Sequence, residues 1–283
     1  MFDWNDMRYF LALAEGGTLS AAARLLKVDH ATVARRITGL ERALGETLVD
    51  RLSKRWQLTQ AGLDLVRLAE GMRTEAHSVE RAVRARRESP STTVTVSAPP
   101  AFASYFLAPR FAELRARHPD LQVSLSGTQA LASLNRQEAD IAVRLWAPTE
   151  MSNVSRRIGK MIYGLYAAPD YSQLPSTQWC FVAYDDSLDH VPEQEWLRSF
   201  ANGRAIAFRS NDLAGQLAAA RMGMGIAALP RFLVEAAAGV VALCDDSFSR
   251  EIHLLIHKDM RRVRAIRIVM DFIAEKVDAD MPR

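Results

Sequence analysis

The feature that most constrains this chain is a succession of three short amphipathic patterns within its first 45 residues. Apolar residues at helical spacing stop at Gly16-Gly17, which predicts a first helix that is buried on one side. Either Thr18 or Ser20 opens a second helix, and Asp29 is a good N-cap for a third. The pattern predicts three packed helices around a miniature core formed by Leu26, Val28, Val33 and Ile37.

The second and third predicted helices have the features of a helix-turn-helix. Ala22 and Ala23 are small where the two helices would cross, so the first helix can brace the second. Two short β-prone runs follow, at residues 48–51 and 56–58, and they predict a basic hairpin, the usual shape of a wing. In such a motif the N-terminal residues of the second helix lie against base edges in the major groove of DNA. The exposed side of that helix offers His30, Thr32, Arg35 and Arg36.

The excess positive charge of the chain lies in its first third. Residues 1–88 hold 15 basic and 12 acidic side chains, whereas residues 89–283 hold 21 of each. Within residues 18–60 the balance is 8 basic against 4 acidic side chains. A surface of this sign suits contact with phosphate, although so small an excess is weak evidence by itself.

From residue 61 to residue 88 the sequence predicts one long helix that contains no proline. Its apolar residues are spaced alternately by four and three, which is the pattern of a coiled-coil seam. Nothing within residues 1–60 is large enough to cover this stripe, so we expect a second copy of the chain to pack on it. Packing on the chain's own C-terminal part is the alternative. The seam consists of Leu65, Ala69, Met72, Ala76, Val79 and Val83.

Residues 89–91 form a linker, after which predicted strands alternate with predicted helices, as in a parallel α/β sheet. The two cysteines, Cys180 and Cys244, have no Cys or His at zinc-ligand spacing, so we expect no metal site. The scattered histidines form no catalytic group, so we expect neither a cofactor nor enzyme activity. No apolar run approaches about 20 residues and the N-terminus lacks a signal-peptide pattern, so we expect a cytoplasmic protein outside the membrane.

An ordered set of residues in the N-terminal part resembles a known family. The run from Thr18 to Arg51, followed by Leu58-Thr59 and Ala61-Gly62, resembles the DNA-binding domain of the LysR-type transcriptional regulators. Within that run the shared positions are Ala22-Ala23, Leu26, Val28, Val33, Ile37, Leu40-Glu41, Leu44-Gly45, Leu48 and Arg51. The later segments APRFAELRARHPDLQVSL, ADIAVR and MGMGIAALP are similar, in order, to the family's effector domain.

The resemblance implies a sequence-specific transcriptional regulator that binds double-stranded DNA and is controlled by a small-molecule effector. It implies an all-α winged helix-turn-helix domain at residues 1–60, a linker and dimerisation helix at residues 61–88, and an effector domain at residues 92–283. A homodimer or homotetramer is expected, with RNA polymerase as a further partner. A solute-binding protein of transport would have no use for residues 1–88, and an enzyme on the same scaffold would need a catalytic group that the sequence lacks.

By the same resemblance, the recognition helix begins near His30, and the wing tip lies at residues 54–55. Two departures from the family's usual pattern stand at its start, Asp29-His30 in place of Ser-Gln and Ala34 in place of serine. Asp29 would repel an approaching phosphate, so we expect binding to depend more on the arginines and the wing. Arg35 or Arg36 contacts either guanine or phosphate, and Arg51 is instead a candidate for an intramolecular pair. The predicted DNA-contacting residues are His30, Ala31, Thr32, Arg35, Arg36, Arg51, Lys54 and Arg55.

The effector domain is similar to the two-lobe α/β fold of periplasmic binding proteins. Lobe I would comprise residues 92–161 and 263–283, and lobe II residues 162–262. Ligands of such folds bind between the lobes at the carboxyl ends of strands, and the hydroxyls, the arginine and a helix N-terminus there suggest an anionic effector. The alternative is that the polar groups only cap helices and that the arginine is a salt-bridge partner. The predicted cleft residues are Ser97, Ala98, Pro99, Thr128, Gln129, Arg144, Phe208, Ser210 and Asn211.

Overall fold

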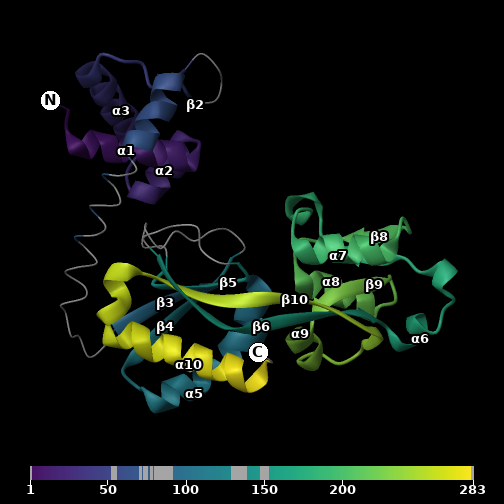
Figure 1. The fold of residues 1–283 in the computed structure, drawn as a ribbon. Helices are drawn as coiled ribbons and strands as arrows, with labels where there is room; N and C mark the ends of the chain where they lie inside the picture. The colour runs from purple at the N-terminus through teal and green to yellow at the C-terminus, as the bar shows by residue number, and fades with distance from the viewer. Residues whose placement is uncertain are drawn as a thin grey trace. The chain divides into compact units, whose positions relative to one another are not determined.

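The computed structural model describes residues 2–51, 56–69, 92–128, 139–146 and 153–281, together with three isolated helical positions, Met72, Ala76 and Val79. The chain forms two compact units, residues 1–80 and residues 81–283 (Figure 1). No helix within the described ranges is long and apolar enough to cross a membrane.

The N-terminal unit contains three helices and a short hairpin, followed by a helix whose described part covers residues 60–69. Thr18 Oγ1 accepts a hydrogen bond from the Ala21 N–H, and Asp29 Oδ1 accepts one from the Thr32 N–H. These contacts satisfy helix N-termini, so both predicted caps are confirmed. The elements are α1 (Trp4–Gly16), α2 (Leu19–Leu26), α3 (His30–Leu44), β1 (Val49–Asp50) and β2 (Gln57–Leu58).

One hydrophobic core holds this unit together. Ala22, Val33 and Ile37 are fully buried in it, so α2 and α3 cross on small and branched side chains, as predicted. The hairpin is antiparallel, with Val49 opposite Leu58. Its tip, which includes the predicted contacts Lys54 and Arg55, lies outside the described residues.

The first part of the predicted dimerisation seam is covered by the chain itself. Ala69 is buried in the core of the N-terminal unit, and Leu65 packs against the same core. The expectation that residues 1–60 could not cover the stripe is therefore wrong for these two positions. Gly62 allows this helix to lie close to the backbone at Leu48, because a Cβ at position 62 would lie 2.2 Å from the Leu48 carbonyl oxygen.

The later seam positions are not covered within the N-terminal unit. Met72 is 46% exposed and Val79 is 66% exposed, and Ala76 is exposed as well. Val83 lies outside the described residues. The unpartnered part of the seam thus begins at Met72 and not at Leu65, about two helical turns later than the sequence pattern suggested.

The C-terminal unit is built on one eight-stranded sheet in the order β4-β3-β5-β10-β6-β9-β7-β8. β3 is parallel to β4 and β5, and β7 is parallel to β8 and β9, whereas β6 and β10 are antiparallel to each other and to their outer neighbours. The strands are β3 (Thr92–Ala98), β4 (Leu121–Gly127), β5 (Ile141–Arg144), β6 (Asn153–Ala167), β7 (Phe181–Ala183), β8 (Ile206–Arg209), β9 (Ile226–Pro230) and β10 (Val241–His257).

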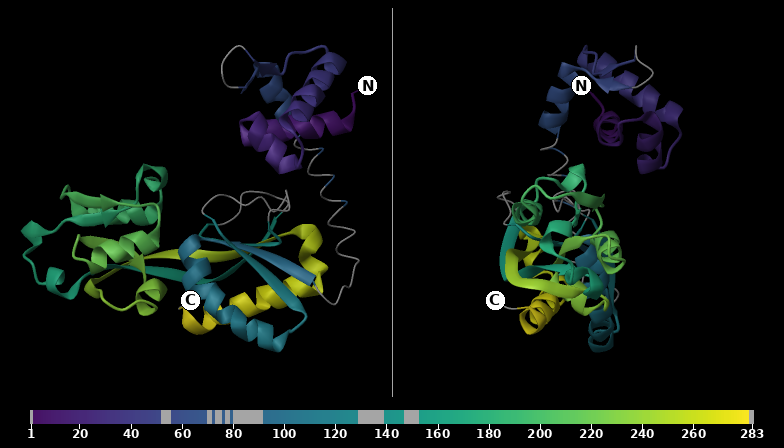
Figure 2. Two further views of the ribbon diagram at one scale, coloured as in Figure 1. Left: turned by 180° about the vertical axis from the view of Figure 1, so that it is seen from behind. Right: turned by 90° about the vertical axis from the view of Figure 1, so that its right-hand side faces the viewer.

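Helices cover both halves of this sheet (Figure 2). The α-helices are α5 (Ala108–Arg117), α6 (Pro169–Ser172), α7 (Pro192–Ala201), α8 (Leu213–Arg221), α9 (Arg231–Glu235) and α10 (Arg264–Asp280). A π-helix, η1 (Phe102–Leu107), precedes α5, and three 3₁₀ turns are η2 (Ser176–Gln178), η3 (Asp186–Leu188) and η4 (Lys258–Arg262).

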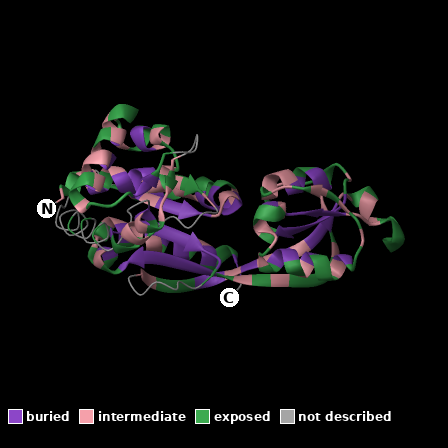
Figure 3. Ribbon diagram, turned by 90° about the horizontal axis from the view of Figure 1, so that it is seen from above, coloured by how far each residue is buried: buried purple, intermediate pink, exposed green. Residues whose placement is uncertain are grey.

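The long antiparallel strands β6 and β10 cross between two lobes, each with buried strands at its centre (Figure 3). The C-terminal half of β10 pairs with β5 and belongs to the core of lobe I, as does Met260 after it. Residues 252–262 therefore lie in lobe I and not in lobe II, where the sequence placed them. The physical reason is that one continuous strand serves both lobes, so the boundary falls inside it.

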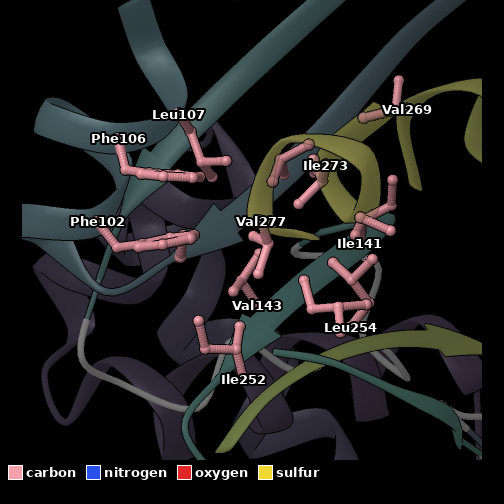
Figure 4. Close-up of a cluster of buried hydrophobic side chains, with 14 of the residues drawn as sticks. Phe102, Phe106, Leu107, Ile141, Val143, Ile252, Leu254, Val269, Ile273 and Val277 are labelled. Carbon is pink, nitrogen blue, oxygen red and sulfur yellow. The ribbon is translucent and has the colours of Figure 1, made fainter. Parts of the chain in front are cut away.

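The hydrophobic core of lobe I is formed by helices that pack on the strands of the sheet. Figure 4 shows side chains of α10 and η1 converging on those of β5 and β10. Phe102 and Phe106 of η1 stack with their ring centroids 4.7 Å apart, and both meet Phe232 of lobe II edge-on. The lobes therefore pack together at η1 in addition to their connection by the two crossing strands.

Candidate nucleic-acid interface and ligand cavity

The start of α3 presents the predicted recognition residues to solvent. His30, Ala31 and Arg35 are exposed, and no ion pair with a described residue involves Arg35. The Thr32 hydroxyl is already engaged, because it donates to Asp29 Oδ2 over 2.9 Å. Hydrogen bonds from the Thr32 backbone N–H and then from its hydroxyl lower the pKa of Asp29, so this carboxylate is negative at neutral pH.

Arg36 lies differently from its predicted place at the DNA surface. Its Nη1 donates to Asp6 Oδ1 over 3.0 Å, and Asp3 Oδ2 lies 3.6 Å away. The guanidinium also lies over the ring of Tyr9. Arg36 thus fastens α3 to α1, a contact between distant segments that the helical pattern gave no means of finding.

Arg51 takes the intramolecular alternative that the sequence left open. It pairs with Glu41, donates to Thr38 Oγ1 over 3.0 Å and lies over the Trp56 ring. Glu41 Oε1 also accepts hydrogen bonds from the Leu48 and Val49 backbone N–H groups. These contacts attach the base of the wing to α3 and fix the two elements relative to each other.

A cavity of about 160 Å³ lies between the two lobes of the C-terminal unit. Lobe I contributes residues from the ends of β3, β4 and β5, and lobe II contributes residues from the segment leading into α7 and from the start of α8. The crossing strands β6 and β10 contribute Met161, Tyr163 and Arg250. The predicted residues that line it are Pro99, Thr128 and Arg144. Lining residues that sequence reasoning missed include Trp146, Tyr163, Tyr184, Glu193, Asp212 and Arg250.

Arg144 is the central cation of this cavity. It is 2% exposed, and its guanidinium donates to Ser97 Oγ over 2.9 Å and to the carbonyl oxygens of Val143 and Ser97 over 2.7 and 3.2 Å. Burial lowers its pKa, yet an arginine remains charged at neutral pH. No carboxylate within the described ranges forms an ion pair with it.

Glu193 and Arg250 form a second charged group in the same cavity. Arg250 Nη1 donates to Glu193 Oε2 over 2.8 Å, and its Nη2 donates to the Leu145 carbonyl over 3.0 Å. The Tyr163 hydroxyl lies 3.5 Å from Glu193 Oε1. Burial first, and then the charge of Glu193, raise the pKa values of Tyr163 and Tyr184, so both phenols stay neutral.

Several predicted cleft residues have other roles. The Ser97 hydroxyl accepts a hydrogen bond from Arg144 and so helps to position that side chain, and Ala98 is buried in the core of lobe I. Phe208 packs against the core of lobe II. Ser210 Oγ accepts from the Asp212 N–H, and the cap of α8 is Asp212 itself, so Ser210 is not the helix cap that the sequence offered as the alternative.

Of the remaining two predicted residues, Asn211 is exposed and does not line the cavity, and Gln129 lies outside the described residues. Within the described parts of the chain, no group of three or more His, Cys, Asp or Glu side chains is arranged to hold a metal ion.

Two family profiles match the chain in order. The bacterial regulatory helix-turn-helix protein, lysR family, matches residues 4–63, and the LysR substrate binding domain matches residues 87–278. The Mau operon transcriptional activator of Paracoccus denitrificans is 29% identical over 284 residues, with 96% of each chain covered. The AhcY transcriptional activator HvrB of Rhodobacter capsulatus is 32% identical over 239 residues, with 79% of this chain and 80% of HvrB covered.

Full-length solved structures share the fold. The Vibrio cholerae virulence activator AphB superposes with a TM-score of 0.61 at 20% identity, covering 97% of this chain and 99% of AphB. LysG of Corynebacterium glutamicum, solved with bound effector Arg, superposes with a TM-score of 0.56 at 18% identity and full coverage of both chains. Since both domains match family profiles in the family's own order, this chain belongs to the LysR family of DNA-binding transcriptional regulators, which are not enzymes.

Proposed function

We propose that this regulator binds operator DNA as a homodimer or homotetramer in the cytoplasm, and that an anionic small molecule in the inter-lobe cavity controls it. Arg144 carries the effector part of the proposal, because it is buried in the cavity wall and no described carboxylate neutralises it. A buried charge is costly unless it is paired, so a ligand that brings a negative group to Arg144 gains more than its contact area alone would give.

For the DNA contact we propose His30, Ala31, Thr32 and Arg35 at the start of α3, with Lys54 and Arg55 of the wing as further contacts. The exposure of Arg35 and its lack of a described ion-pair partner support its role. We assign Arg36 and Arg51 to bracing, since their guanidinium groups are held by Asp6 and Glu41. The braced helix and wing then present one preformed surface to DNA.

Control by the effector follows from how the lobes are joined. The cavity has residues of both lobes in its wall, and β6 and β10 run through both. A ligand that contacts both lobes binds more tightly to the arrangement of the lobes in which both contacts are made. This difference in affinity shifts the protein toward that arrangement and thereby couples ligand binding to DNA binding. LysG, which shares this fold, was solved with bound effector Arg, and this supports a small-molecule effector for the present chain. RNA polymerase is a further proposed partner, supported by relatives named as activators.

A gel-shift experiment with the gene's own upstream region tests this proposal. The wild-type protein should give a specific shift at moderate salt, and a panel of carboxylates should change that shift. Arg144→Gln should bind the DNA equally well without any carboxylate and should lose the response. Arg156→Gln, which alters an exposed arginine of the same domain, is the control and should respond normally. Absence of any specific shift with the wild-type protein would contradict the regulator proposal itself.

A further inference from the structure

We infer that the effector is a compact monoanion with one carboxylate and an apolar, single-ring-sized body. This inference rests on the proposed function, because it names the chemical class of the ligand for the same cavity. Three independent features of the cavity support it, namely its volume, the distribution of its charges and the composition of its remaining wall.

The volume limits the size of the ligand. Sites for drug-sized ligands are usually about 300 Å³ or larger. The cavity here is about 160 Å³, close to the roughly 150 Å³ of an apolar cavity that accommodates benzene. A single ring or a short branched chain fills such a space, whereas a nucleotide, a disaccharide or a polycyclic acid does not.

The charges limit the ligand to one negative group. Two arginines, two acids and one histidine, His190, line the cavity. Arg250 is already neutralised by Glu193, and Asp212, the N-cap of α8, adds a further negative charge on the side of lobe II. Arg144 is therefore the one arginine among the described lining residues that has no ion-pair partner. A first carboxylate is attracted to it, whereas a second one finds no further unpaired arginine and is repelled by Asp212.

The rest of the wall suits an apolar body. Tyr163 and Tyr184 are buried, and the lining also contains Leu188, Val191, Leu213 and Trp146, with His190 as a polar residue among them. The Tyr163 hydroxyl already donates to Glu193, so it does not offer its proton to a ligand. Aromatic rings stack on or pack edge-on against such side chains, whereas a polyhydroxylated ligand needs many more polar partners.

Calorimetry on the full-length protein with three matched probes tests the inference. Benzoate has one ring and one carboxylate, benzamide replaces the charge by a neutral amide, and phthalate adds a second carboxylate. We expect benzoate to bind at least ten times more tightly than either of the others. Arg144→Gln should remove the preference for benzoate over benzamide, Arg144→Lys should retain part of it, and Arg156→Gln should leave it unchanged. Circular dichroism of each variant verifies that it is folded.

The possible outcomes separate the inference from the proposed function. Phthalate that binds as tightly as benzoate and depends on Arg144 would overturn the monoanion class while leaving an anionic effector in place. Benzamide that binds as tightly as benzoate in both the wild type and Arg144→Gln would overturn the role of the charge. Binding of none of the three probes would overturn the single-ring class. In each case the operator gel shift independently decides whether the chain is a DNA-binding regulator.

Discussion

Arg250 on β10 and Glu193 at the start of α7 form the most buried ion pair among the described residues, with side chains that are 13% and 5% exposed. Arg250 also links the lobes, because its Nη2 donates a hydrogen bond to the Leu145 carbonyl oxygen of lobe I. A single arginine on a crossing strand thus contacts both sides of the cavity.

Glu193→Gln should lower the free energy of unfolding by about 3–5 kcal/mol, because it leaves the buried Arg250 charge without its partner. Urea denaturation followed by circular dichroism measures this loss. Asp271→Asn is the matched control, since it breaks a solvent-exposed pair with Arg156 and should cost much less. Equal losses of unfolding free energy in the two variants would show that burial does not increase the contribution of the Glu193 pair to stability.

Arg35→Ala and Arg36→Ala should act on different properties. Removing Arg35 should weaken operator binding by about 1–3 kcal/mol while leaving the melting temperature unchanged, because the side chain is exposed. Removing Arg36 should chiefly lower the melting temperature, because it leaves Asp6 without its cation. Fluorescence anisotropy with operator DNA and thermal melting separate the two effects. A selective loss at one base pair for Arg35→Ala would indicate base reading, and a uniform loss would indicate a phosphate contact.

Asp29→Ser should strengthen operator binding several-fold, with a larger gain at low salt. Serine retains the cap of α3 but removes a negative charge from the helix N-terminus that faces the proposed DNA surface. Anisotropy measured over a range of salt concentrations gives the affinity and its salt dependence. Asp170→Asn, an equal change of charge on an exposed residue of lobe II, should leave binding unaltered.

An ion-pair network between α5 and α10 should make the stability of the C-terminal unit depend on pH. Hydrogen bonds from Lys276 and Arg117 lower the pKa values of Glu113 and Glu275 respectively. Since folded-state pKa values are depressed, the stabilisation is present above the unfolded pKa values and is lost as the pH falls through the folded ones. Urea midpoints of the Glu113→Gln/Glu275→Gln double variant should therefore fall below wild type at neutral pH and converge with it in acid. A difference that stays constant down to acid pH would exclude this linkage.

Local elements of the fold were predictable from the sequence because their signals are local. The caps at Thr18 and Asp29 stand next to the helices they begin, and a continuous buried run marks β5 (Ile141–Arg144). Only part of each long strand, β6 and β10, has such a signal, because the rest carries exposed polar residues such as Arg156 and Asp246. Such stretches lack the alternating or continuous apolar pattern by which strands are recognised.

The cavity was less predictable because it is assembled from distant segments. Arg144 follows a strand, where the fold places ligands, so its position could be inferred. Glu193 stands in the first turn of a helix, where an acidic residue is ordinary, and Arg250 lies within a polar stretch of β10. Neither position carries a signal of its own, and only the crossing of β10 brings Arg250 to Glu193.

The exposed part of the coiled-coil seam should mediate self-association. Met72→Glu combined with Val79→Glu should shift the protein from dimer to monomer in sedimentation velocity, because each exposed apolar side chain would place a like charge against its copy. Leu63→Glu is the matched control, since Leu63 is 47% exposed but lies outside the seam. Ala69→Glu should instead unfold the N-terminal unit, because Ala69 is buried in that unit's own core. A double variant that remains dimeric would show that the copies associate through another surface.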